Sequence, residues 1–290
     1  MSGGALRRRL HEYVLLTRLN RPIGILLLLW PVLWALWIAA QGVPPLKLLG
    51  VFVLGTILTR SAGCVINDFA DRDLDPGVER TRERPLAARR VSPQEALLLF
   101  ALLMLLALGV VLQLDTRTVY ASAVAALLLS SYPFFKRFFP APQLYLGIAF
   151  GWGVPMAFLA VLGSVPPVGW LIFLAAVVWA GIYDTFYAMV DREDDRRIGI
   201  RSTALLFGRY DLLAIGLLQL LMLGLLVGVG LVAGLGAVYF GALGGVTVLF
   251  ARQLWICRER ARAACFQAFL DNHHVGWLVF AGIALATLQH

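Results

Sequence analysis

The stretch Asn67-Asp68-Phe69-Ala70-Asp71-Arg72-Asp73-Leu74-Asp75 lies where a long apolar segment gives way to a basic loop. A second stretch, Asp191-Arg192-Glu193-Asp194-Asp195, ends another apolar segment much later in the chain. Both contain the pattern Asp-Arg-x-x-Asp. Carboxylates near lipid are scarce and costly, so two acidic clusters at matching places are the best candidates for chemistry.

The composition indicates a membrane protein. Of the 290 residues, 60% are hydrophobic and 14% are charged, whereas soluble domains have about half and a quarter. The apolar segments can cross a hydrocarbon core roughly 30 Å thick as helices, and the alternating strands of a closed barrel are not evident. We therefore expect an all-α membrane protein with a single domain over residues 1–290. Nine spans are predicted: roughly 22–40, 46–68, 95–113, 117–133, 143–163, 168–190, 211–233, 237–256 and 274–289.

The positions of the 25 Lys and Arg residues predict the orientation of the chain. Apart from Lys47 and Arg117, all of them lie at the N-terminus, in the second span, in loops that follow even-numbered spans or, for Arg252, near the end of the eighth span. The positive-inside rule then places both acidic clusters on the cytoplasmic side and the C-terminus outside. Basic loops against membrane ends are explained by orientation and anionic lipid, so nucleic-acid binding is not favoured.

A polar stripe runs along the second span. Arg60, Asn67 and Asp71 are spaced i, i+7 and i+11, which places them on one helix face. A guanidinium pointing at lipid would be expensive, so we expect this stripe to face a polar cavity inside the bundle. Snorkelling of Arg60 to the interface is the alternative.

The sixth span repeats this arrangement. Asp184, Asp191 and Asp195 have the same spacing, with Tyr187 at the edge of their face. A carboxylate as deep in the membrane as Asp184 needs a cation or a water-filled cavity. The matching clusters predict two four-helix halves related by an internal repeat, with a ninth helix added. The expected halves are about 14–142 and 143–273.

Two acidic clusters flanked by arginines would hold an anion through metal. Like charges 4 Å apart repel by about 4 kcal/mol at an effective dielectric of 20, so a phosphate cannot approach these carboxylates unaided. Oxygen-only ligands, carboxylates plus the Asn67 amide, favour Mg²⁺ over zinc or copper. With metal on its oxygens a diphosphate becomes a good leaving group. The lipid-facing bundle would accommodate an isoprenoid tail sideways.

The motifs resemble those of the UbiA-type intramembrane prenyltransferases. The resemblance rests on Asn67-Asp68-x-x-Asp71-x-x-x-Asp75 and on Tyr183-Asp184-Thr185-x-Tyr187-Ala188-x-x-Asp191-x-x-Asp194-Asp195. Supporting motifs are Arg18-x-x-Arg21-Pro22-Ile23-Gly24, Arg60-x-Ala62-Gly63-Cys64, Arg80-Thr81-x-x-Arg84-Pro85-Leu86 and Ser202-Thr203-Ala204-x-x-Phe207-Gly208. Arg201 departs from the lysine expected before Ser-Thr-Ala but keeps the charge.

This resemblance implies nine helices around a central cavity, Mg²⁺ dependence and an active site toward the cytoplasm in the bacterial inner membrane. The implied reaction transfers a polyprenyl group from its diphosphate to the ring carbon ortho to the hydroxyl of 4-hydroxybenzoate. The product would be 3-polyprenyl-4-hydroxybenzoate, in ubiquinone biosynthesis. Tail length and oligomeric state are not specified by the sequence.

The resemblance also implies roles for individual residues. The implied metal and diphosphate ligands are Asn67, Asp71, Asp75, Asp191 and Asp195. The implied substrate-binding residues are Asp68, then Arg18, Arg21, Arg82 and Arg201 for phosphate oxygens, and Arg60 or Arg137 for the benzoate carboxylate. The expected catalytic residues are Asp71, Tyr187 bordering the allylic cation, and Asp191 or Asp184 taking the proton released when the ring regains aromaticity.

Other functions remain open from the sequence. An ion-coupled transporter would explain Asp184 and Arg60, but not why both acidic clusters lie at the ends of spans. A phosphatidyl-alcohol transferase would need an Asp-Gly-x-x-Ala-Arg motif, which is absent. UbiA-type enzymes that use haem, a naphthoate, homogentisate or a sugar phosphate as acceptor are closer alternatives. The Tyr-Asp-Thr-x-Tyr-Ala motif favours 4-hydroxybenzoate.

Overall fold

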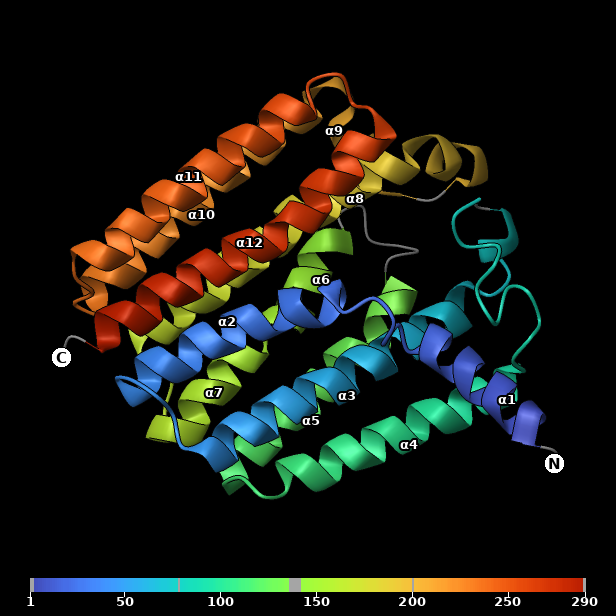
Figure 1. Ribbon diagram of the computed structural model, residues 1–290, viewed down its shortest axis with the longest axis horizontal. Helices are drawn as coiled ribbons and strands as arrows, with labels where there is room; N and C mark the ends of the chain where they lie inside the picture. Colours follow the sequence, from blue (N-terminus) through green and yellow to red (C-terminus); the bar gives the residue numbers. More distant parts are fainter. Residues whose placement is uncertain (1–2, 78, 136–141, 200, 289–290) are drawn as a thin grey trace.

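The computed structural model describes residues 3–77, 79–135, 142–199 and 201–288. Throughout these ranges the regular structure is helical (Figure 1). The helices are α1 (Gly3–Leu16), α2 (Ile23–Ala40), α3 (Leu46–Asp71), η1 (Asp75–Gly77), α4 (Pro93–Val111), α5 (Thr116–Phe135), α6 (Pro142–Gly151), α7 (Gly153–Leu162), α8 (Pro167–Ile198), α9 (Thr203–Phe207), η2 (Gly208–Tyr210), α10 (Asp211–Val232), α11 (Ala237–Ile256) and α12 (Arg262–Thr287).

Eight helical segments of the described chain are long and apolar enough to cross a membrane. They coincide with the first eight predicted spans, which confirms an all-α membrane architecture. The fifth span is broken at Trp152 into α6 and α7. The predicted ninth span, 274–289, falls in the second half of α12, a helix of 26 residues that begins at Arg262 and carries the polar run 271–274. The count of nine therefore stays a prediction.

The core forms where α2, α8 and α12 meet. Trp34 of α2 and Trp179 of α8 stack with their ring centroids 5.3 Å apart. Both indoles also donate hydrogen bonds to α12, Trp34 to the carbonyl oxygen of Gly276 (3.0 Å) and Trp179 to Oδ1 of Asn272 (2.9 Å). A Cβ atom on Gly276 would lie 2.3 Å from Cδ1 of Trp30, so only glycine lets the helices approach this closely.

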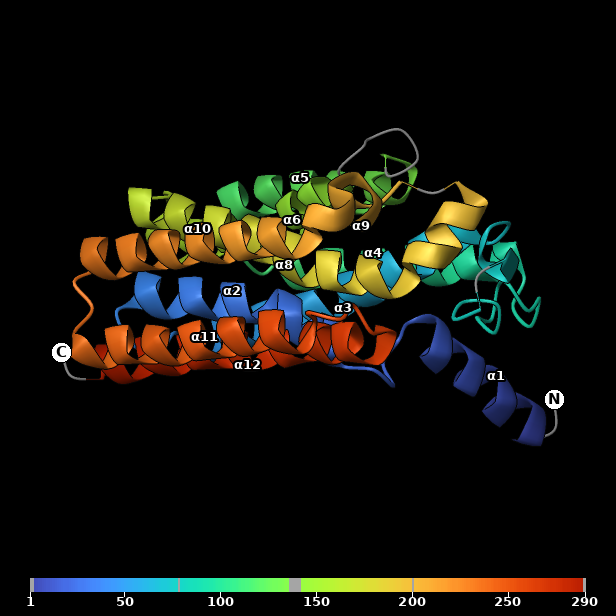
Figure 2. The same ribbon diagram turned by 90° about the horizontal axis from the view of Figure 1, so that it is seen from above.

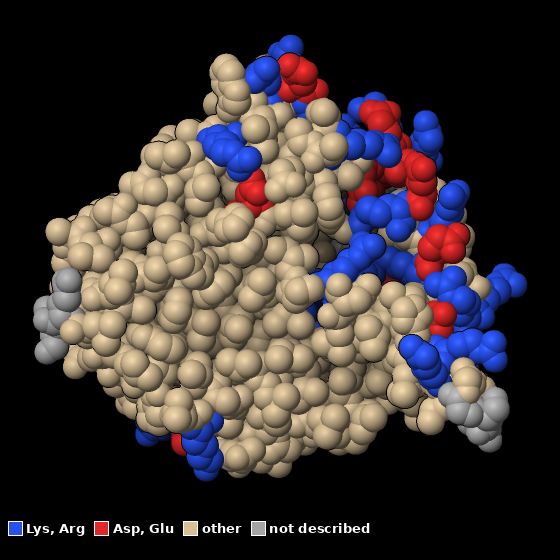
Figure 3. Space-filling model, viewed as in Figure 1, with Lys and Arg blue, Asp and Glu red and all other residues tan. Residues whose placement is uncertain are grey.

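The helices run roughly parallel to one another, with α10 and α11 at one edge and α4 at the other (Figures 1 and 2). The acidic ends of α3 and α8 lie at the same end of the bundle as α1. On the face shown in Figure 3, most charged side chains gather at this end, while most of the remaining surface carries no charged residue. The fold therefore brings the two sequence clusters to one pole of the molecule. The internal repeat over 14–142 and 143–273 stays a prediction.

Candidate active site

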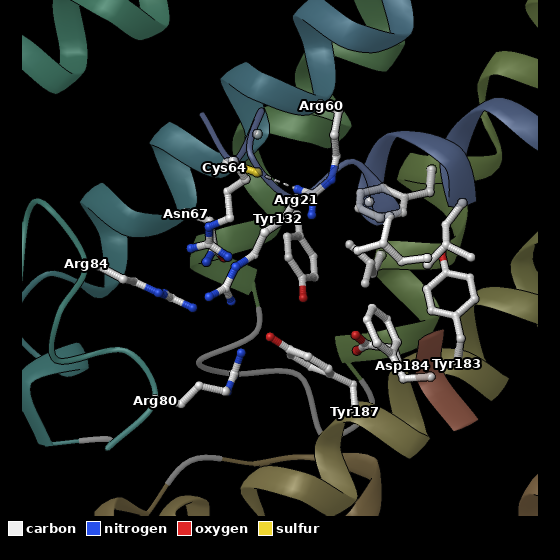
Figure 4. A pocket seen from close by; sticks show the side chains of 18 of the residues that line it. Arg21, Arg60, Cys64, Asn67, Arg80, Arg84, Tyr132, Tyr183, Asp184 and Tyr187 are labelled. Atoms are coloured by element: carbon white, nitrogen blue, oxygen red, sulfur yellow. Dashed lines mark hydrogen bonds between the residues drawn. The ribbon is translucent and has the colours of Figure 1, made fainter. Parts of the chain in front are cut away.

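A cavity of about 350 Å³ opens at the charged end of the bundle. Its wall is formed by residues of α1, α2, α3, α5, α6, α8 and α12 and of the two loops that precede α2 and α4. Figure 4 shows the side chains of Arg80, Arg84, Tyr132, Asp184 and Tyr187 directed into this space. The predicted site residues in its wall are Arg18, Arg21, Arg60, Asn67, Asp184 and Tyr187.

The second acidic cluster is tied to this cavity through Arg80. The guanidinium of Arg80 donates one hydrogen bond to Oδ1 of Asp191 (Nε, 3.0 Å) and a second, shorter one to Oδ2. The same guanidinium lies 4.3 Å from the ring centroid of Tyr187, a cation–π arrangement. Since Arg80 follows the first acidic cluster in the chain, its loop connects that cluster to Asp191 of α8.

The first acidic cluster is tied to the cavity through Arg84 and Arg18. Arg84 Nη1 lies 2.8 Å from Oδ2 of Asp75 and 3.1 Å from Oδ1 of Asp68. Arg18 Nη2 lies 2.5 Å from that same Asp68 oxygen. Asp68 is fully buried and outside the cavity wall, where its carboxylate pairs with both arginines.

Burial shifts the titration of groups in this loop. It raises the pKa of the Asp75 carboxyl above its usual range, even though the Arg84 guanidinium acts in the opposite direction. Burial, together with the nearby Arg18, lowers the pKa of Arg84. Burial thus disfavours the ionised form of Asp75 and the charged form of Arg84. A divalent cation beside Asp75 would stabilise its ionised carboxylate more strongly than Arg84 does.

The guanidinium of Arg60 lies inside the bundle, against Cys64 and Phe150. Its Nη1 lies 2.8 Å from Sγ of Cys64, and its guanidinium lies 5.7 Å from the ring centroid of Phe150. Its Nε is buried and without a hydrogen-bond partner, and no carboxylate of the described residues lies within ion-pair distance of it. Arg60 therefore faces the cavity as the stripe predicts, with a charge that an anionic ligand would compensate.

Tyr132 of α5 lies in the cavity wall, which it shares with residues of α3 and α8. Its hydroxyl points into the same space as Asp184 and Tyr187 (Figure 4). It lines the cavity together with Asn67 of the first polar stripe and Asp184 of the second. Its position makes it a candidate for contact with the reacting groups.

The other predicted site residues of the described chain lie outside the cavity wall: Asp68, Asp71, Asp75, Asp191, Asp195, Arg82 and Arg201. Arg82 is exposed on the loop between η1 and α4, and Arg201 is exposed just before α9. Asp195 is buried at the end of α8. Arg137 lies outside the described residues. Of the arginines in the loop, the structure thus favours Arg80 and Arg84 over Arg82 as partners for a ligand.

The donor set fits a hard divalent cation. Asp71, Asp75 and Asp195 are each less than a tenth exposed, and Asn67 Nδ2 donates a hydrogen bond to Oδ2 of Asp71 (3.2 Å). Within the described ranges, three or more such ligands do not yet converge on one point. Buried carboxylate and amide oxygens without His or Cys are the ligands of Mg²⁺. The residues present therefore suit Mg²⁺ by type.

Comparison with curated proteins gives close relatives over nearly the full chain. The chain is 56% identical to a protein named 4-hydroxybenzoate octaprenyltransferase of Alkalilimnicola ehrlichii, covering 98% of this chain and 97% of that one. It is also 56% identical to the protein of the same name from Xanthomonas oryzae pv. oryzae, covering 96% and 93%.

Solved structures share the fold. A UbiA homolog from Aeropyrum pernix in its apo form superposes with a TM-score of 0.78 at 26% identity, covering 90% of this chain and 97% of that one. A UbiA homolog from Archaeoglobus fulgidus bound to GPP and Mg²⁺ superposes with a TM-score of 0.74 at 19% identity, covering 96% and 100%. The model of the UbiA prenyltransferase family matches residues 28–287. The chain therefore belongs to the UbiA prenyltransferase family.

Proposed function

We propose that this protein is a Mg²⁺-dependent 4-hydroxybenzoate polyprenyltransferase that produces 3-polyprenyl-4-hydroxybenzoate, a step of ubiquinone biosynthesis. The observation that carries the proposal is the Arg80–Asp191 pair, which joins the loop after the first acidic cluster to the second cluster at one cavity. The relatives named 4-hydroxybenzoate octaprenyltransferase support the donor and acceptor classes. The fold neighbour bound to GPP and Mg²⁺ supports the metal.

The diphosphate of the donor would lie at the charged end of the cavity. Asn67, Asp71, Asp75, Asp191 and Asp195 would hold Mg²⁺ and through it the diphosphate oxygens. When bound, the metal neutralises the charge that develops on the diphosphate as the C–O bond breaks. Guanidinium groups in the cavity wall would bind the outer phosphate oxygens, because arginine matches phosphate bidentately. These are Arg18, Arg21, Arg80 and Arg84.

The acceptor would lie deeper, against Arg60. The benzoate carboxylate would pair with this guanidinium, whose Nε has no hydrogen-bond partner among the residues that the structure describes. The aromatic side chain of Phe150 packs beside it and would cover one face of a flat ring. A pocket that buries a charged hydrogen-bond donor selects strongly for acceptors that carry the matching anion.

The reacting groups would meet beside Tyr187 and Asp184. The ring carbon ortho to the hydroxyl forms the new C–C bond as the allylic C–O bond breaks, and the electron-rich face of Tyr187 would stabilise the allylic cation. The proton on that ring carbon then leaves, and Asp184 or Asp191 would accept it. The carboxylate of Asp184 is directed into the cavity (Figure 4), which favours it in this role.

The setting of the site supports a cytoplasmic orientation in the bacterial inner membrane. The charged pole would face the cytoplasm by the positive-inside rule, since it carries most of the arginines. Apolar side chains such as Leu27, Leu129 and Leu146 complete the cavity wall, so the polyprenyl tail would pass among the helices toward lipid.

Product formation in detergent tests this function. The purified chain is incubated with a polyprenyl diphosphate, Mg²⁺ and a panel of labelled acceptors: 4-hydroxybenzoate, a naphthoate, homogentisate and haem. We expect 3-polyprenyl-4-hydroxybenzoate as the main product, and no gradient is needed. Preference for another acceptor would replace the proposed substrate, and absence of any prenylated product would favour a transporter.

A further inference from the structure

We propose that Arg80 and Arg84 are exchangeable counter-ions: each holds an aspartate of one acidic cluster until metal takes that aspartate over, and then binds the phosphate oxygens. Metal and diphosphate would consequently bind interdependently. This inference rests on the proposed function, because it concerns the same site. Arg80 and Arg84 would then determine the order and the strength with which metal and diphosphate bind.

Arg80 binds the same carboxylate oxygens of Asp191 that a metal ion would need. Two nitrogens of its guanidinium donate to the two oxygens of that carboxylate. A bidentate arginine uses the same lone pairs through which a carboxylate binds a cation. Arg80 and a metal at Asp191 therefore exclude each other, so binding of one requires movement of the other.

Arg80 also covers the aromatic face assigned to the allylic cation. Its guanidinium lies 4.3 Å from the ring centroid of Tyr187. A carbocation stabilised by that ring would need the same face, because cation–π attraction acts within about 6 Å of the centroid. The Arg80 guanidinium thus lies where both the metal ion at Asp191 and the allylic cation at Tyr187 would bind. When it moves away, both places become accessible together.

Arg84 holds the first cluster in a way that permits its release. Its Nη1 lies within 3.1 Å of both oxygens of Asp75 and 3.1 Å from Asp68. If Arg84 moves away, Asp68 still has Arg18 at 2.5 Å. The exchange would therefore expose Asp75 to metal without leaving Asp68 as an unpaired buried charge, which would be strongly destabilising.

The electrostatic consequence is coupling between the two ligands. A metal that binds alone must displace an arginine that then remains nearby without an anionic partner. A diphosphate that binds alone meets arginines that are already paired with carboxylates. When both bind, the displaced guanidinium groups pair with phosphate oxygens, so each ligand should strengthen the other by tenfold or more, a typical size for such coupling.

Metal and pyrophosphate binding to the full chain in detergent test this inference. Mn²⁺ binding alone is measured by electron paramagnetic resonance, and binding of radiolabelled inorganic pyrophosphate is measured with and without Mn²⁺. We expect Arg80→Gln and Arg84→Gln to bind Mn²⁺ alone about tenfold more tightly than the unaltered chain does. The factor by which Mn²⁺ strengthens pyrophosphate binding should be about tenfold smaller in each variant than in the unaltered chain. Arg89→Gln, an exposed position of the same loop, is the matched control.

The outcomes separate the two proposals. If the unaltered chain shows coupling but Mn²⁺ binds alone no more tightly to either variant, the arginines are only phosphate ligands or structural clamps, and the inference is wrong. If the unaltered chain binds neither Mn²⁺ nor pyrophosphate, the proposed function itself fails. Thermal melting in detergent identifies a variant that does not fold, in which case the other variant decides.

Discussion

Gly24 on α2 and Arg60 on α3 approach so closely that a Cβ atom on residue 24 would lie 2.5 Å from Nε of Arg60. The absence of a side chain at position 24 is therefore what lets the guanidinium occupy its place in the cavity. The neighbouring atoms belong to the flexible end of Arg60, so a larger residue would displace the guanidinium without disturbing the helices. This relationship makes Gly24 a positioning residue for the proposed acceptor site.

Gly24→Ala should weaken acceptor binding selectively. We expect the KM for 4-hydroxybenzoate to rise about tenfold, because the Arg60 guanidinium moves away from the carboxylate by more than a hydrogen bond tolerates. The KM for the polyprenyl diphosphate should not change. Gly55→Ala is the control, since a Cβ there meets no atom within 4 Å. Equal effects on both substrates would show that Gly24 matters only for packing.

Arg60→Gln should remove discrimination for the carboxylate. We expect kcat/KM for 4-hydroxybenzoate to fall about 100-fold, the cost of losing a charged hydrogen-bonded partner in a buried site. Activity with an acceptor that lacks the carboxylate, such as a simple phenol, should change little. Steady-state kinetics with both acceptors measure this, and a parallel loss for both would assign Arg60 to the donor or to the fold.

Tyr187→Leu should slow the chemical step. The ring stabilises a cation by about 1–2 kcal/mol in a desolvated site, so kcat should fall about 5- to 30-fold. Tyr187→Phe keeps the ring face and should retain most of the rate. Single-turnover measurements compare the two variants. If Phe were as slow as Leu, the hydroxyl and not the ring would be the contributing group.

Removal of divalent metal should abolish transfer. Treatment with EDTA is expected to stop product formation, and Mg²⁺ should restore it, because the carboxylates repel a diphosphate without a cation between them. Monovalent salt at equal ionic strength serves as the control. Full activity in excess chelator would overturn the metal assignment.

Gly276→Ala tests the packing of the core. A Cβ there would lie 2.6 Å from the Trp179 ring as well as 2.3 Å from Trp30, and large aromatic groups cannot yield easily. We expect a loss of about 1–3 kcal/mol of stability, seen as a lower Tm in detergent. Gly244→Ala, where no atom lies within 4 Å, should leave Tm unchanged. Equal melting of both variants would contradict the close approach of α2, α8 and α12.

The membrane-spanning helices and the polar residues that face the cavity could be predicted from the sequence because the chain has few charged residues. In a chain this apolar, a carboxylate or guanidinium inside a helical span has few permissible environments, so Arg60 and Asp184 could be placed facing a cavity from helical spacing alone. The same reasoning placed the two acidic clusters close to the ends of the second and sixth spans, but α8 continues through its cluster to Ile198, eight residues beyond the predicted end of that span.

The contacts of the loop between η1 and α4 could not be predicted in the same way. Arg80, Arg82 and Arg84 alternate along a segment without helical periodicity, so nothing in their spacing says which of them turn inward. The Arg80–Asp191 pair joins residues 111 positions apart and depends on how the whole bundle closes, whereas Arg84 turns back to Asp75 within its own segment. Arg82, expected to bind phosphate, is exposed, while its two neighbours line the cavity.

Tyr132 and the break at Trp152 also lay beyond sequence reasoning. Tyr132 is one aromatic residue among many in an apolar helix, and only its neighbours in space distinguish it. The break between α6 and α7 follows no proline at the junction itself, and Pro155 lies within the first turn of α7, where proline is tolerated. Both features are set by tertiary packing and not by local preference.

The central claim is that both acidic clusters act on a single metal-bound diphosphate, and a double-mutant cycle tests it most directly. Mg²⁺-dependent turnover is measured for Asp71→Asn, Asp191→Asn and the double variant, with Asp73→Asn, an exposed neighbour, as control. We predict that each single variant loses at least about 100-fold and that the double variant loses little more, because residues that act as one unit are not additive. Near-normal turnover in either single variant, or losses that multiply in the double variant, would contradict the account.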